Sequence, residues 1–303
     1  MRKPVLFVLL CFVLQVLGAQ EISKELILQV SSLPEAKLGF TVHFCFPFLQ
    51  GDSDLTNDNN INFGLTAEAS PVSLNGIAEA VWTPVAFFQF AAGGRMGTGW
   101  DIELFGGEIH GIGLNRDDGS GNAEHSGSAF DGLLWKVQTG AALQFDLAAL
   151  YPGEWHHVVA RSYHEINYSG YSGAKANESW FFEDDDGENC NGFNYYGNLL
   201  IGYQMPVFIN IIALLAEADL YLYDTPDRSV WRDDIIRWTF SVITGFKINE
   251  KLELTLITQF RTRKNYLDSN ADDLYYRKRT INSSKPQSLE FYRVAAAVVF
   301  KLQ

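Results

Sequence analysis

The chain has 303 residues, of which 47% are hydrophobic and 14% aromatic, and its formal net charge at pH 7 is −13. A chain this acidic repels phosphate groups, which excludes nucleic acid as a partner and disfavours binding to anionic membrane surfaces. No Pro- or Ser-rich linker divides the sequence, so a single domain is expected.

The first nineteen residues have the pattern of an export signal. Arg2 and Lys3 precede an apolar stretch at 5–17, and small residues precede a cleavage point at Gln20. The most apolar later stretch, 206–215, is shorter than the roughly 20 residues that a membrane helix needs. The chain is therefore expected to leave the cytoplasm without a helical membrane anchor.

The region 38–48 alternates between two kinds of side chain. Its even positions, from Leu38 to Phe48, hold only Leu, Val or Phe, and its odd positions hold Gly, Thr, His, Cys and Pro. A period of two is that of a β-strand with one face in an apolar medium. Because the pattern recurs along the chain behind an export signal, the sequence predicts an all-β, transmembrane, antiparallel up-and-down β-barrel of the bacterial outer membrane.

About ten strands fit the rule that short periplasmic turns alternate with long outer loops, and eight or twelve are the alternatives. We expect strands at 38–48, 61–82, 85–105, 131–149, 154–171, 193–204, 207–223, 234–248, 251–264 and 288–302. Outer loops are then expected at 49–60, 106–130, 172–192, 224–233 and 265–287. The second strand is the weakest, because Pro71 and Asn75-Gly76 are typical of a turn or a bulge. The predicted organisation is a signal peptide at 1–19, a periplasmic N-terminal segment at 20–37 and one barrel domain at 38–303.

Charged residues keep to one face of the predicted strands. In the strand at 131–149, Trp135 and Val137 face one way while Lys136 and Gln138 face the other. A charge on the lipid face would cost about 2–4 kcal/mol at mid-membrane, which gives this segregation a physical cause. A soluble β-sandwich is the alternative, but its polar face would carry more Lys and Glu, and its apolar face fewer Trp and Phe.

The last predicted strand, from Tyr292 to Phe300, reads like the closing strand of an outer-membrane protein, although three residues follow the final aromatic residue. The stretches TPVAFFQFAAGGRMGTGW, GLLWKVQTGAALQFDLAALYPGEWHHVV and GYQMP resemble spirochaete outer-membrane proteins of unassigned function. The resemblance implies a location and a barrel fold, and it implies no activity.

Charged side chains of both signs are expected to point into the lumen. The candidate lumen-lining residues are Arg95, Asp101, Glu103, Lys136, Arg161, Glu165, Glu217, Asp219, Arg237, Arg261, Arg263 and Arg293. A ten-stranded barrel leaves little open space, so these charges either pair with one another or line a narrow selective pore.

Metal sites are weakly indicated. The adjacent His156 and His157 would point to opposite faces of a strand and cannot hold one ion. Asp184, Asp186 and Glu188 form a weak calcium candidate that resembles part of an EF-hand loop but lacks its full spacing. A solvated acidic loop is the simpler interpretation, and neither a metal nor a cofactor is predicted.

The outer loops contain one candidate catalytic cluster. Ten strands is also the architecture of the omptin proteases, and His110 and His125 lie in predicted outer loops, with Asp117, Asp118 and Asp131 nearby. No omptin motif is visible, so the chain is predicted not to be an enzyme, with an outer-membrane hydrolase as the minor alternative.

The two cysteines after the signal, Cys45 and Cys190, are a candidate disulfide in an oxidising compartment. The bridge would attach the third long outer loop to the first strand. The sequence supplies no distance between them.

Two classes of function remain open. The first is a narrow barrel that passes or binds small solutes. The second is a surface-exposed adhesin or ligand-binding protein that acts through its long acidic loops, such as 172–192. In either class the expected partners are outer-membrane lipid and the barrel-insertion machinery.

Overall fold

The computed structural model describes residues 21–33, 35–104, 106–127, 129–130, 132–183 and 185–302. The predicted signal peptide lies outside this part of the chain. Within it, no helix has the length and apolar character of a membrane span.

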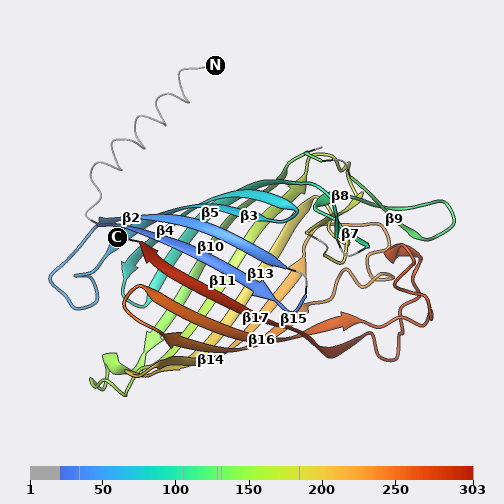
Figure 1. Cartoon of the computed structure of the whole chain (residues 1–303). Helices are drawn as coiled ribbons and strands as arrows, with labels where there is room; N and C mark the ends of the chain where they lie inside the picture. Colours follow the sequence, from blue (N-terminus) through green and yellow to red (C-terminus); the bar gives the residue numbers. More distant parts are fainter. Residues whose placement is uncertain are drawn as a thin grey trace.

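Twelve antiparallel strands, each paired with its neighbours in sequence, close into one barrel (Figure 1). They are β1 (Glu21–Ser31), β2 (Ala36–Pro47), β3 (Asn60–Ser70), β4 (Ser73–Val85), β5 (Phe88–Gly99), β10 (Leu134–Asp146), β11 (Val158–Tyr171), β13 (Gly192–Gln204), β14 (Ile209–Tyr221), β15 (Arg237–Lys247), β16 (Leu252–Lys264) and β17 (Gln287–Leu302). The barrel closes where β1 pairs with β17, from Lys24 opposite Leu302 to Ser31 opposite Ala295. The prediction of an all-β, antiparallel, closed barrel is confirmed, whereas the expected count of about ten strands was wrong and twelve was among the alternatives.

Two expectations about the first third of the chain were wrong. Residues 20–37 were expected to precede the barrel, but Glu21–Ser31 is strand β1, whose alternating Ile22, Leu26 and Leu28 are exposed on the outer face. The predicted strand 61–82 is the hairpin of β3 and β4, and its turn lies at Pro71 and Val72. Ten expected strands therefore become twelve.

Because of the two additional strands, one predicted outer loop lies at the other end of the barrel. Glu21, Leu302 and the connections 48–59, 86–87, 147–157, 205–208 and 248–251 lie at one end of the barrel, which is at the left in Figure 1. The long connections 100–133, 172–191, 222–236 and 265–286 lie at the opposite end, with the tight turns 32–35 and 71–72. The loop at 49–60, expected among the outer loops, therefore lies with the short turns.

The long loops, at the end of the barrel opposite the short turns, contain their own short strands. They are β6 (Ile102–Leu104), β7 (Gly107–Ile109), β8 (Ile112–Asp117), β9 (Ala123–Ser126) and β12 (Ser179–Phe182). β12 pairs with β8, and β8 pairs with β9, so loops distant in sequence form one small sheet. Two 3-10 turns complete the described elements, η1 (Leu147–Ala149) and η2 (Tyr276–Lys278).

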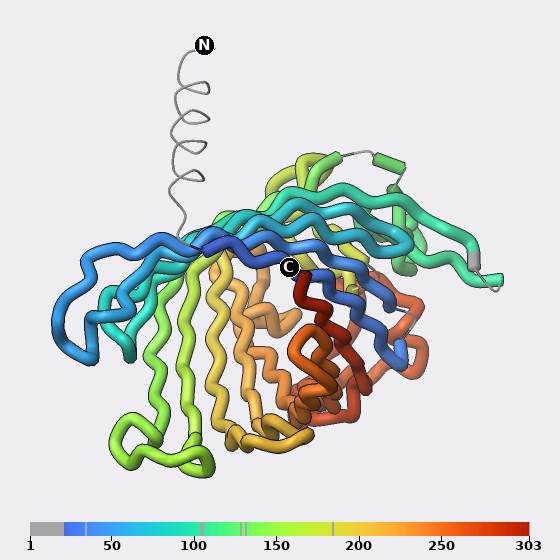
Figure 2. The backbone as a smooth tube through the Cα atoms, turned by 60° about the vertical axis from the view of Figure 1, so that its left-hand side comes forward, coloured from blue at the N-terminus to red at the C-terminus, as the bar shows by residue number. Residues whose placement is uncertain are grey.

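The outer surface of the barrel carries large apolar side chains, as the alternation predicted. Val137 on β10 and Leu214 on β14 are more than half exposed, and Phe240 and Val242 on β15 are exposed as well. The residues next to them in sequence point inward. Inward-facing polar residues such as Glu165 on β11 and Ser241 on β15 are buried. A closed sheet with an apolar exterior and a polar interior is typical of a barrel surrounded by lipid. The tube view in Figure 2 shows the barrel wall and the loops gathered at its ends.

Candidate functional site

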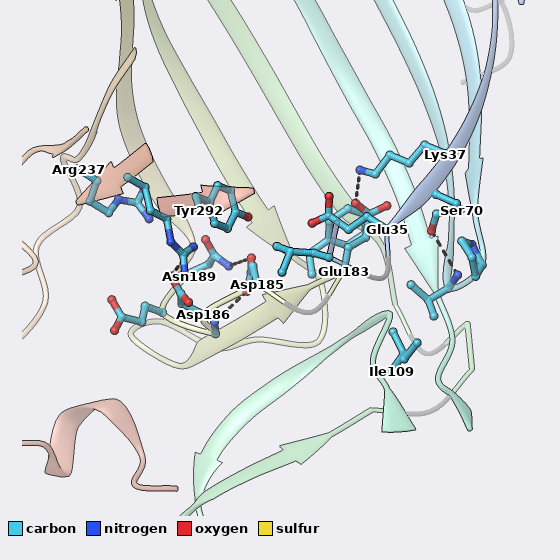
Figure 3. Close-up of a pocket in the computed structure, with 18 of the residues that line it drawn as sticks. Glu35, Lys37, Ser70, Ile109, Glu183, Asp185, Asp186, Asn189, Arg237 and Tyr292 are labelled. Carbon is cyan, nitrogen blue, oxygen red and sulfur yellow. Dashed lines mark hydrogen bonds and ion pairs between the residues drawn. The ribbon is translucent and has the colours of Figure 1, made fainter. Parts of the chain in front are cut away.

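The connection between β11 and β13 folds back over the mouth of the barrel at the long-loop end. Its segment 182–189 lines a cavity of 460 Å³ together with the barrel wall (Figure 3). The other lining residues are Leu33, Glu35, Ala36, Lys37, Ser70, Pro71, Val72, Ile109, Tyr221, Arg237, Arg261 and Tyr292. This segment, called here the mouth loop, narrows the entrance to the lumen.

Ion pairs fasten the mouth loop, which starts from β11 and β13, to strands on either side of the β1–β17 pair across the barrel. Glu183 pairs with Lys37 at the start of β2 and accepts a hydrogen bond from Ser73 on β4. On the other side, Asp186 Oδ2 lies 3.5 Å from Arg261 Nη1 on β16. The loop therefore crosses the mouth instead of extending into solvent.

A buried triad holds the end of the mouth loop. Lys264 Nζ lies 2.7 Å from Glu188 Oε2 and 3.1 Å from Asp233 Oδ1, and each of the three side chains is less than 10% exposed. Tyr266 donates a further hydrogen bond to Glu188. Two carboxylates sharing one ammonium group inside the protein depend strongly on that cation, because each would otherwise be a buried unpaired charge.

Charges of opposite sign face each other across the cavity. Arg237 and Arg261 project from the adjacent strands β15 and β16, while Glu183, Asp185 and Asp186 come from the mouth loop (Figure 3). Some of these charges pair directly, as Arg261 does with Asp186, so a solute that enters the cavity meets charged groups of both signs.

Asp185 is the mouth-loop carboxylate with the most perturbed acidity. Its side chain faces the cavity and keeps contact with water there, and desolvation by the protein packed around it raises its pKa from 3.8 to about 7. The negative charge of Asp186 acts in the same direction, whereas hydrogen bonds from the Gly187 amide and the Asn189 side chain act in the opposite direction. The charge of the mouth therefore changes near neutral pH.

Further cavities continue from the mouth along one wall of the lumen. One of 180 Å³ shares Asn189, Tyr221 and Arg237 with the mouth cavity. It shares Tyr196 with a cavity of 280 Å³ that extends to Gln89, near the β4–β5 turn at the opposite end. The shared lining residues place these cavities next to one another along the barrel axis, and their walls are mainly polar side chains.

Many charges inside the barrel are paired with one another, which is one of the two arrangements that the sequence predicted. Lys136 Nζ lies 2.8 Å from Glu165 Oε1, which also accepts a hydrogen bond from Asn167. Arg95 Nη2 lies 2.8 Å from Glu68 Oε1. These pairs join neighbouring strands, as the ion pairs of Glu183 and Asp186 join the mouth loop to the barrel.

A glycine makes room for the Arg95–Glu68 pair. Asn75 bridges the two residues, since it accepts a hydrogen bond from Arg95 Nε and donates one to Glu68. Gly97 lies opposite Asn75, and a Cβ atom at that position would be 2.1 Å from the Asn75 side-chain oxygen. A larger residue at 97 would therefore displace the bridge.

The structure places most of the twelve predicted lumen residues on barrel strands, facing the interior. Those that border a cavity or an internal polar contact are Arg95, Lys136, Arg161, Glu165, Glu217, Asp219, Arg237, Arg261 and Arg293. Asp101 and Glu103 were misplaced, because β5 ends at Gly99 and both lie in the outer connection 100–133. Arg263 lies at the outer end of β16 and pairs with Asp272 of the connection 265–286.

Arg261, Asp186 and Glu188 were among the predicted candidates, but other residues at the mouth were absent from the prediction. Glu35 and Lys37 lie in the segment that was assigned outside the barrel, and Glu183 and Asp233 lie in loops that were interpreted as solvated. A strand pattern extended back to residue 21 would have found Lys37. No local pattern indicates that a loop returns into the lumen.

The predicted disulfide is not formed. Cys45 lies near the end of β2 opposite Glu21, at the short-turn end of the barrel, and Cys190 is buried beside Tyr221 and Tyr223 at the long-loop end. The two thiols are free. Burial raises the pKa of Cys190 to about 11, which keeps it as an unreactive thiol.

Both described residues of the weak calcium candidate are used in ion pairs. Asp184 lies outside the described residues, Asp186 is paired with Arg261, and Glu188 is paired with Lys264. Among the histidines, His157 pairs with Asp146, its Nδ1 lying 2.7 Å from the Asp146 Oδ2, and His156 contacts the Tyr151 carbonyl. His110 and His125 come together in the outer loops, away from Asp117 and Asp118, which form ordinary turns.

Comparisons with known proteins find likenesses of structure alone. No protein-family model matches the chain, and no curated protein does either. The KdgM porin is similar over 93% of this chain and 99% of its own, with a TM-score of 0.36 and 10% identity. The KdgM porin in complex with disordered oligogalacturonate has a TM-score of 0.37 and 9% identity, over 93% of this chain and 99% of its own. The Salmonella typhi OmpF complex with daunomycin has a TM-score of 0.27 and 7% identity, over 94% of this chain and 98% of its own. Because these TM-scores are below 0.5, the three likenesses indicate nothing about the function of this protein. The resemblance to spirochaete outer-membrane proteins stays a prediction.

Proposed function

We propose that this protein is an outer-membrane channel with a narrow lumen, constricted at its outer mouth by the loop 182–189, that passes small hydrophilic solutes. The observation that carries the proposal is the row of adjacent polar cavities along the barrel axis, beginning at a mouth of 460 Å³ with charged walls. The barrel is closed by β1 and β17 and does not need a loop anchored across its entrance. A loop in that position narrows the lumen, as a constricted channel requires.

The membrane location rests on the exterior of the barrel. Burying the exposed apolar side chains of twelve strands in hydrocarbon removes them from water, and apolar patches of this extent are rare on soluble monomers. The long loops then face outward and the chain ends face the periplasm, as in outer-membrane barrels.

The fold weakens the surface-ligand alternative at its main candidate loop. Part of 172–192 is tucked into the mouth, where Glu183 and Asp186 are held by barrel cations. Acidic residues that already pair with the barrel offer less to an external partner. The connection 100–133 with its β8–β9 hairpin extends from the barrel in Figure 1 and is the segment on which this alternative now depends.

Conductance in planar lipid bilayers tests the proposal. The purified full-length mature chain, inserted from detergent, is expected to give small uniform conductance steps and to let sugars no larger than a disaccharide swell liposomes. A heat-denatured sample is the control. Insertion that is verified by a heat-modifiable band but gives neither conductance nor swelling would contradict a channel.

A further inference from the structure

We infer that the outer loops contain a binding site for one divalent transition-metal ion, built by Asp101, Glu108 and His110. One donor atom from each residue lies within 4.8 Å of the others. The three donor residues do not line the mouth cavity, although Ile109 of the same hairpin does, so the site lies in the outer loops beside the channel mouth. A mixed carboxylate and imidazole donor set favours Zn²⁺ over Ca²⁺ or Mg²⁺, which prefer oxygen ligands alone.

The backbone brings these donors together. β6 and β7 form a hairpin in which Ile102 is opposite Ile109, so the next residues outward, Asp101 and His110, face each other. Glu108 belongs to the same hairpin. Three donors on one tight hairpin are held at nearly fixed separations, which lowers the entropy lost when an ion binds.

The contact between Asp101 and His110 has the spacing of two ligands on one ion. Asp101 Oδ2 lies 3.4 Å from His110 Nδ1, and that nitrogen is buried without a hydrogen-bond partner. Ligands at about 2.0–2.1 Å from a tetrahedral Zn²⁺ lie about 3.3 Å apart. A buried polar atom lacking a partner is uncommon in proteins, and a metal ion would satisfy it.

The surroundings orient the donors. The other oxygen of Asp101 accepts a hydrogen bond of 2.9 Å from the Gly111 amide, which fixes the carboxylate in the way that outer-shell contacts fix metal ligands. Phe181, which is buried, packs against the His110 ring at 5.5 Å between centroids. The His125 ring of β9 lies 5.0 Å from that of His110 and packs beside it.

Calorimetric titration with ZnCl₂ tests the site, using a refolded chain without a polyhistidine tag at pH 7.5, where imidazole is neutral. We expect one Zn²⁺ per native chain, and binding at least ~10-fold weaker in His110→Ala and in Asp101→Asn, which keeps the shape of the side chain. His156→Ala removes an exposed histidine at the opposite end of the barrel and is the matched control. Its binding should equal that of the native chain.

A second measurement separates loss of the site from loss of the fold. The native chain loaded with Co²⁺ should show the intense visible absorption of a tetrahedral ion, and His110→Ala should lack it while keeping the heat-modifiable band of a folded barrel. No Zn²⁺ binding by the native chain, or equal binding by His110→Ala and the native chain, would overturn the inference. Unchanged bilayer conductance in the variants is expected, so a failure here is distinct from a failure of the channel.

Discussion

Arg261 on β16 and Asp186 in the mouth loop are 75 residues apart in the sequence, and their Nη1 and Oδ2 atoms lie 3.5 Å apart. The pair joins the barrel wall to the loop that crosses the entrance. Both side chains retain contact with water, so the pair stabilises the fold by less than about 1 kcal/mol. Its larger effect is on the charge that a passing solute meets.

Neutralising one member of this pair should change ion selectivity. Asp186→Asn removes one negative charge from the mouth and leaves Arg261 with Glu290 as its remaining carboxylate partner, so the reversal potential in a salt gradient should shift toward anion preference. Arg261→Gln should shift it toward cation preference. Arg116→Gln is the control, because it breaks an ion pair with Glu178 between outer loops. Identical reversal potentials in all four proteins would show that ions do not pass Arg261 and Asp186.

Removing the cation of the buried triad should release the mouth loop. In Lys264→Met, Glu188 and Asp233 lose their shared partner, which destabilises the folded state by about 3–5 kcal/mol. The temperature at which the compact band disappears on unboiled gels should fall, with noisier channel currents. Lys301→Met breaks the exposed pair with Glu253 and should change that temperature little. Equal shifts for the two variants would argue against the triad.

The outer face of the barrel is tested by a pair of leucines with the same exposure. Leu214, in the middle of β14, is 63% exposed, and Leu150, in the short-turn connection 147–157, is 65% exposed. Leu214→Arg should destabilise the inserted barrel by about 2–4 kcal/mol, whereas Leu150→Arg lies outside the hydrocarbon and should have little effect. Chemical unfolding in lipid vesicles measures both. Equal effects would be inconsistent with lipid around β14.

The charge of the mouth should depend on pH through Asp185. Since its pKa is raised from 3.8 to about 7, the folded protein keeps a proton that the unfolded chain has already released. The free energy of unfolding therefore falls as pH rises between these two values and is level above them. The carboxylate becomes charged above pH 7, so cation preference should increase between pH 6 and pH 8. Asp185→Asn should remove this dependence, and persistence of it would assign it to another group.

The period of two predicted the barrel and the apolar exterior, because lipid contact imposes it on every strand. It failed where a turn is too short to interrupt the pattern. Pro71 and Val72 form a two-residue turn between β3 and β4, which resembles an irregularity inside one long strand. Strand β1 was overlooked because it contains few large aromatic residues, and its membership depends on pairing with β17, at the other end of the sequence.

The candidate site was less predictable than the fold. Alternation placed Arg237 and Arg261 on the inner face correctly, because each follows from its own strand. The mouth loop depends on contacts between residues far apart, such as Lys37 with Glu183 across 146 positions, and no local pattern contains them. Acidic residues in a loop have the same appearance in sequence whether they face water or a cation in the lumen.

The most direct test of the account is the single-channel conductance of a variant with a shortened mouth loop. Trp180 and Asn189 already pair across the base of this loop, so residues 183–187 can be replaced by two glycines without separating its ends. Small conductance steps from the native chain and clearly larger steps from the variant are predicted. Equal conductance of the two folded, inserted proteins, or none from either, would contradict a channel constricted by this loop.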